Sequence, residues 1–126
     1  CTAAAFCECM LRAGGEALLQ AAHRQIAMPS IAGHPAGAAV DVRVIGVSMG
    51  APIWEFNRKA YTFSPEIPRD AMRNRWLLRR AMLAAGFAPF DGEWWHFSYG
   101  DKEWARYYGQ RYARYDQLEY RTSRTN

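Results

Sequence analysis

The chain has 126 residues, of which half are hydrophobic and 14% are aromatic. This composition excludes an intrinsically disordered chain, and the length suits one globular domain over residues 1–126. No apolar run approaches the roughly 18 residues of a membrane helix, so we expect no membrane span. The formal net charge of +4 suits an anionic partner and equally suits an ordinary enzyme, so it selects neither.

Residues 1–15 are expected to form a poorly defined N-terminal segment that contains all the cysteines, Cys1, Cys7 and Cys9. Their odd number argues against a closed disulfide framework, so we expect free thiols. A short helix is predicted over residues 16–26 and a loop over residues 30–37. A strand is predicted from Ala38 onward because Val40, Val42 and Val44 alternate with other residues. The valines are expected to face the core, and Asp41 the opposite side.

A long helix is predicted from Ser64 to Ala85. Ser64 is a favoured N-cap residue, Pro65 suits the first helical position, and Gly86 favours a helix end. We expect the arginines of this helix to point outward. The residues expected to point inward are Ala71, Leu78, Ala81, Met82 and Ala85.

The last third of the chain contains a predicted strand at residues 93–99, which follows a tight turn at Asp91 and Gly92. A helix is predicted at residues 102–118, and residues 121–126 are expected to form a frayed tail. The alternation of helices and strands predicts an α+β fold, with a small antiparallel sheet and flanking helices.

Four side chains supply a set of groups suited to a metal site: His34, Asp41, Glu93 and His96. Two imidazoles and one carboxylate can hold an ion with one open position, and the remaining carboxylate can act as a general base. These donor types favour zinc but leave manganese and iron open. In a flat strand, positions 93 and 96 face opposite ways, so a turn must bring Glu93 round to the other side.

The segment from His34 to Asp41, HPAGAAVD, resembles the H-x-x-G-x-A-x-D signature of zinc D,D-peptidases. Residues 93–96, EWWH, resemble the E-W-W-H motif of the same enzymes. The order and separation of the motifs are similar to those of the VanX-type D-alanyl-D-alanine dipeptidase family, and the similarity runs over residues 28–99. The resemblance implies a D,D-peptidase or Hedgehog-like zinc fold, with an N-terminal part that is shortened in this sequence.

The resemblance also implies the roles of the four residues. His34, Asp41 and His96 would hold one Zn²⁺ ion, and Glu93 would be the catalytic base. The implied activity is that of a D,D-dipeptidase or D,D-carboxypeptidase, which hydrolyses D-Ala-D-Ala or a related small D-peptide of peptidoglycan metabolism. Such a protein would act in the bacterial cytoplasm or periplasm.

Two departures from the family pattern define an alternative. Family members have a Tyr-Arg-Pro segment whose arginine stabilises the oxyanion, and no such segment precedes Glu16. Trp54 stands where family members have an acid that holds the substrate ammonium, and the neighbouring Glu55 is the candidate substitute. The alternative is therefore a zinc-binding pseudoenzyme, or an incomplete relative that lacks the stabilising arginine.

A different class of function is suggested by residues 104–114, where arginines alternate with tyrosines. Such a segment can bind phosphates and stack on bases. Aromatic residues at helical spacing more often pack onto a core, so we expect no nucleic-acid partner. The sequence predicts no particular oligomeric state.

Overall fold

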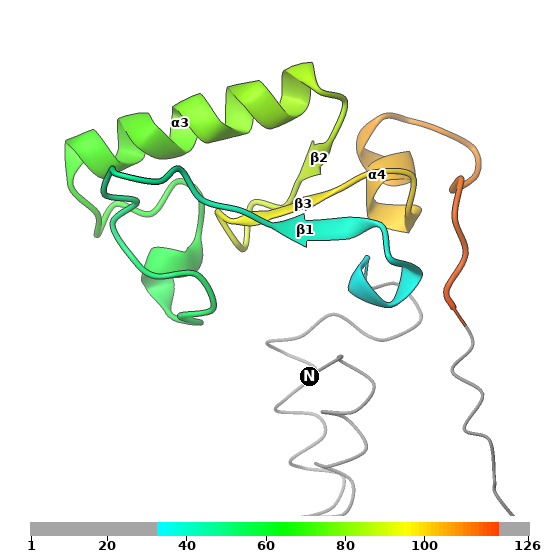
Figure 1. Cartoon of the computed structure of the whole chain (residues 1–126), viewed down its shortest axis with the longest axis horizontal. Coiled ribbons are helices and arrows are strands. Elements are labelled where there is room, and N and C mark those ends of the chain that lie inside the picture. The colour runs from blue at the N-terminus through cyan, green and yellow to red at the C-terminus, as the bar shows by residue number, and fades with distance from the viewer. Residues whose placement is uncertain (1–32, 119–126) are drawn as a thin grey trace, which may run out of the picture.

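The structure, a computed structural model, describes residues 33–118. The predicted helix at 16–26, the cysteines and the two predicted terminal segments therefore lie outside the described residues. Within residues 33–118 the chain forms an α+β arrangement, which confirms the predicted fold class (Figure 1). In chain order the elements are η1 (His34–Ala36), β1 (Ala39–Asp41), η2 (Arg58–Ala60), α3 (Arg69–Ala84), β2 (Ala88–Pro89), β3 (His96–Ser98) and α4 (Lys102–Tyr107).

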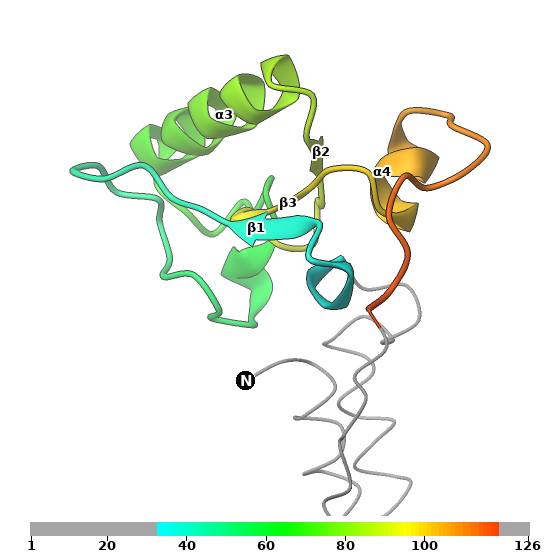
Figure 2. The ribbon, with the colours of Figure 1, turned by 45° about the vertical axis from the view of Figure 1, so that its right-hand side comes forward.

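The three strands form an antiparallel sheet with β3 in the centre, between β1 and β2. Every residue of β3 is buried. In Figures 1 and 2, α3 lies above the strands and η1 lies below them. Both α3 and α4 contact β2. The register places Asp41 opposite His96 and Ala39 opposite Ser98, so the end of β1 lies beside the start of β3.

The strand predicted from Ala38 to Val44 is shorter than expected, and Val40 and Asp41 face the opposite way from the prediction. β1 ends at Asp41, and Val40 is 40% exposed, whereas Asp41 is half-buried. Opposite the missing part of the strand, the chain preceding His96 forms a turn, although the Val42 amide still donates to the Trp95 carbonyl at 2.9 Å. Regular alternation therefore stops at Asp41, although Val42 and Val44 still pack against the core.

The long helix ends as predicted but starts later. Ser64 does not cap it, because its hydroxyl accepts a hydrogen bond from the Glu66 amide at 3.2 Å within a turn. Pro68 disfavours the helical conformation at the residue before it, so α3 begins at Arg69. At the other end, Gly86 has the left-handed φ of 86° that stops a helix, as expected.

The buried face of α3 contains Ala71 and Leu78, as predicted, but it also contains Arg75. Arg75 is only 1% exposed, which contradicts the expectation that all the arginines point outward. Residues 71, 75 and 78 share one helical face, so Arg75 is carried inward with its apolar neighbours. Ala81 and Ala85, which were predicted to be inward, are exposed.

Two predicted elements near the C-terminus are also too long. The strand at 93–99 is reduced to β3, because residues 93–95 form the turn that leads into it. The helix at 102–118 ends at Tyr107, and Gly109 then adopts a left-handed φ of 63° that redirects the chain. Trp104 is buried as an inward residue, whereas Tyr112 and Tyr115 are exposed.

The main core lies between α3 and the sheet. It contains Trp94 and Trp95, which are 2% and 0% exposed, so both tryptophans of the EWWH segment pack in this core. The other buried members of this core are Met49, Ala60, Leu78 and Phe97. None of the helices in the described part is long and apolar enough to cross a membrane.

Candidate metal centre

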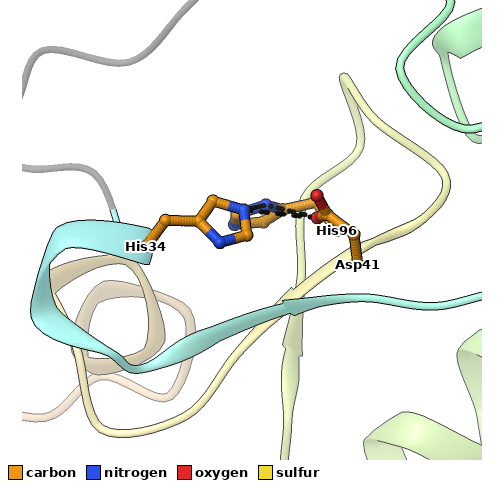
Figure 3. A group of neighbouring side chains, drawn as sticks. All are labelled: His34, Asp41 and His96. Atoms are coloured by element: carbon orange, nitrogen blue, oxygen red, sulfur yellow. Dashed lines mark hydrogen bonds and ion pairs between the residues drawn. The ribbon is translucent and has the colours of Figure 1, made fainter. Parts of the chain in front are cut away.

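Three side chains from separate elements converge at the edge where β1 meets β3 (Figure 3). His34 is the first residue of η1, Asp41 is the last residue of β1, and His96 is the first residue of β3. Asp41 and His96 are direct partners in the antiparallel ladder, which brings their side chains close. The tight turn of η1 adds His34 from the adjoining segment. The chain therefore gathers a group that the sequence spreads over more than sixty positions.

The donor atoms of this cluster form a small triangle. Nε2 of His34 lies 3.1 Å from Nδ1 of His96, and Oδ1 of Asp41 lies 3.3 Å from each of these nitrogens. Donors bonded at ~2.0–2.2 Å lie about 3.3–3.6 Å apart around a tetrahedral ion and about 2.8–3.1 Å apart at right angles. The triangle falls within these limits. Oδ1 of Asp41 is also buried without an ordinary hydrogen bond, so the three residues fit a small metal ion.

The pKa values of Asp41 and His96 reflect how close the acceptor atoms of the cluster lie to one another. At Asp41 and His96, burial favours the uncharged form of the side chain, but other contacts outweigh it. For Asp41, the close imidazoles of His34 and His96 and the hydrogen bond from Trp54 hold the pKa well below its ordinary value despite burial. For His96, burial is outweighed by Asp41 and Glu103, which raise the pKa to about 9. Without a metal ion, a proton on His96 therefore balances the neighbouring carboxylates.

Glu93 lies beside the cluster, with its Oε2 3.9 Å from Nδ1 of His96. The amide of His96 donates to the carbonyl of Glu93 at 3.1 Å, which closes a turn. This turn places the two side chains on the same side, as the metal-site hypothesis requires. Burial raises the pKa of Glu93, although the nearby His96 opposes the rise. A raised pKa brings a carboxylate closer to the range in which it works as a general base.

Two residues that the sequence did not single out as contacts of the site touch the cluster from outside. The indole N–H of Trp54 donates to Oδ2 of Asp41 at 2.7 Å. Oε2 of Glu103 lies 3.6 Å from Nε2 of His96, the ring nitrogen that faces away from the triangle. Each contact joins segments that meet only through the tertiary fold, and neither follows a motif spacing. Knowledge of how the loop after β1 and helix α4 fold back toward the cluster would have been needed to find them.

Glu55, the predicted substrate-binding residue, does not join the three-residue cluster. Its carboxylate instead accepts a short hydrogen bond from the side chain of Asn57. Asn57 caps η2 by accepting from the Lys59 amide at 2.8 Å. This arrangement ties Glu55 to the η2 loop, so any role in binding a substrate remains a prediction.

The fold and the cluster together define a small α+β domain with a candidate metal site and an adjacent carboxylate. The sequence profile of the D-ala-D-ala dipeptidase family matches residues 16–117. The chain therefore belongs to the D-Ala-D-Ala dipeptidase family, as the sequence resemblance predicted.

Two curated relatives carry the name D-alanyl-D-alanine dipeptidase. The protein from a Synechocystis species is 35% identical over 103 residues, which cover 69% of this chain and 42% of the relative. The protein from Escherichia coli is 35% identical over 69 residues, which cover 51% of this chain and 36% of the relative. The chain thus spans less than half the length of these relatives.

Proposed function

We propose that this chain is a zinc peptidase that hydrolyses D-Ala-D-Ala or a related small D-peptide of peptidoglycan metabolism. The observation that carries the proposal is the triangle of donor atoms from His34, Asp41 and His96, with Glu93 at its side. Membership of the D-Ala-D-Ala dipeptidase family supports the choice of substrate. Two imidazoles and one carboxylate favour zinc among the divalent ions.

In this mechanism His34, Asp41 and His96 hold the ion, and Glu93 handles the proton. A zinc ion held there would supply Lewis acidity for the scissile carbonyl and would acidify water. The carboxylate of Glu93 accepts the proton of the attacking water and passes it to the nitrogen of the leaving amine. Its raised pKa suits both transfers, because an acid close to the working pH can accept and release a proton.

A second candidate is a zinc-binding protein with little or no turnover. It applies if no arginine from outside these 126 residues takes the role of the Tyr-Arg-Pro segment, which does not occur within them. Loss of an electrostatic stabiliser of the oxyanion typically lowers the rate by ~100- to 1000-fold. Both candidates bind zinc, so zinc content does not separate them.

The deciding experiment compares turnover in two zinc-loaded proteins. The 126-residue chain is purified, loaded with one equivalent of zinc and supplied with D-Ala-D-Ala, and released D-alanine is measured. Glu93→Gln should lower kcat by ~100- to 10,000-fold, because the general base is lost. Its zinc stoichiometry should stay at one.

Glu66→Gln is the matched control, because Glu66 is a carboxylate that pairs with Arg58 at the surface. Its turnover should equal that of the unmodified chain. Zinc binding without turnover in the unmodified chain would favour the second candidate. Full activity in Glu93→Gln would refute the proposed role of Glu93.

A further inference from the structure

Trp54 has a backbone conformation that its own packing does not explain. Its φ is 65°, and among residues 33–118 it is the one residue other than glycine with a positive φ. This left-handed conformation is unfavourable for a residue with a Cβ atom. The side chain is 63% exposed, so burial of the ring offsets little of this cost. A strained, exposed tryptophan therefore needs another reason for its position.

The contact of Trp54 supplies that reason. Its indole N–H donates to Oδ2 of Asp41 at 2.7 Å, while Oδ1 of the same carboxylate faces the imidazoles of His34 and His96. Oδ2 of Asp41 therefore binds Trp54, and Oδ1 is left to face the two imidazoles. A carboxylate without this bond can rotate and offer either oxygen, or both, to an ion. The indole is a neutral donor, so it fixes the carboxylate without adding a charge that repels a cation.

We propose that Trp54 is a positioning residue that holds Asp41 as a ligand through Oδ1 alone, and so preorganises the donor triangle before an ion arrives. This inference rests on the metal site of the proposed function. Groups that hydrogen-bond to metal ligands set ligand orientation, and their loss typically lowers metal affinity by ~10- to 100-fold. The strain at Trp54 is then the cost of directing the indole N–H at Asp41.

Two substitutions at position 54 separate positioning from a structural role. Trp54→Phe keeps an aromatic ring but removes the N–H, so zinc affinity should fall by ~10- to 100-fold. Trp54→Gly removes the N–H and also relieves the left-handed conformation, so zinc affinity should fall while the metal-free protein unfolds at the same or a higher temperature. Zinc affinity is measured by competition with a chelating dye, and unfolding of the metal-free protein by circular dichroism.

Trp76→Phe is the matched control, because Trp76 is 48% exposed on α3 and packs against Phe63. It should leave zinc affinity unchanged. Unchanged affinity in Trp54→Phe would overturn the inference, as would a loss of folding stability parallel to the loss of affinity in both variants. Failure of the proposed peptidase activity is a separate result, because it appears as absent turnover in a zinc-loaded chain. A chain that binds no zinc would overturn both the metal site and the role of Trp54.

Discussion

Beneath α3 two nitrogens of the Arg75 guanidinium donate to carbonyl oxygens, whereas at the edge of β1 and β3 three potential acceptors face one another. Arg75 donates to the carbonyls of Met49 and Tyr61 at 2.7 and 2.8 Å, and it lies over the ring of Trp94. Although burial lowers the pKa of Arg75 to about 10, the side chain keeps its charge at neutral pH. Nε and Nη1 meet carbonyl acceptors, whereas Nη2 is buried without a hydrogen-bond partner, so the protein itself satisfies most of this buried group.

The cluster of His34, Asp41 and His96 has the opposite chemistry. Its three ligand atoms lie 3.1–3.3 Å from one another. Such an arrangement is balanced only by a cation, either a proton or a metal ion. Buried polar groups that hydrogen-bond within the fold contribute to stability. Clustered acceptor groups that lack donors from the protein indicate a binding site for a cation.

Arg75→Met should have the largest effect on folding. The substitution leaves the Met49 carbonyl without its buried donor and removes a second charge-assisted bond to the Tyr61 carbonyl, which keeps the Ser64 amide as a donor. The free energy of unfolding should therefore fall by about 3 kcal/mol, as measured by urea denaturation of the metal-free protein. Arg73→Met, at an exposed position of the same helix, should be close to neutral. If Arg75 serves the fold alone, the folded Arg75→Met protein should bind zinc as tightly as the unmodified chain. A loss of zinc affinity in the folded variant would contradict the distinction between the two regions.

The stability of the metal-free protein should fall as the pH rises from about 6.5 to 9. The pKa of His96 is raised from 6.5 to about 9 in the folded state. Protonated His96 therefore stabilises the fold fully below pH 6.5, and this contribution is lost as the pH passes 9. The loss should stay below about 3.5 kcal/mol, since each unit of difference in pKa corresponds to about 1.4 kcal/mol.

Urea denaturation at several pH values would measure this trend, and His96→Asn should flatten it. Zinc should reverse the trend, because zinc binds the neutral imidazole and its affinity therefore rises with pH. An equally steep loss of stability in His96→Asn would show that another group is responsible.

Glu103→Gln should have the smallest effect of the three. Glu103 faces the outer nitrogen of His96 at 3.6 Å, so its charge supports the orientation and basicity of the ring. Zinc affinity should fall by about tenfold, or about 1.4 kcal/mol, as measured by dye competition. Glu66→Gln again serves as the control. An unchanged zinc affinity would show that only the three residues of the triangle, and not Glu103, contribute to cation binding.

Local sequence rules predicted the features that depend on neighbouring residues. The motif spacings identified the cluster residues and Glu93, and Gly86 marked the end of α3. Other features depend on contacts between distant segments. The buried position of Arg75 depends on carbonyls in the preceding loop, and the contact of Trp54 depends on how that loop returns to β1.

Proline, glycine and turn residues explain why three elements are shorter in the structure than predicted. Pro68 delays the start of α3, and Gly109 turns the chain soon after α4 ends. β1 stops early because the residues opposite its continuation form a turn. In each case the helical or alternating pattern of the sequence extends beyond the residues that adopt the helix or strand.

Asp41 is paired with His96 in the register of β1 and β3, so the binding of an ion by both residues would depend on the alignment of the two strands. A slip by one residue would turn the side chains of β1 to the opposite face and separate the donors. β1 has only three residues, so its own contacts specify this alignment weakly. An ion that binds only the native alignment would stabilise it by mass action. Metal present during folding would then favour chains with the native strand alignment, because only those chains could retain the ion.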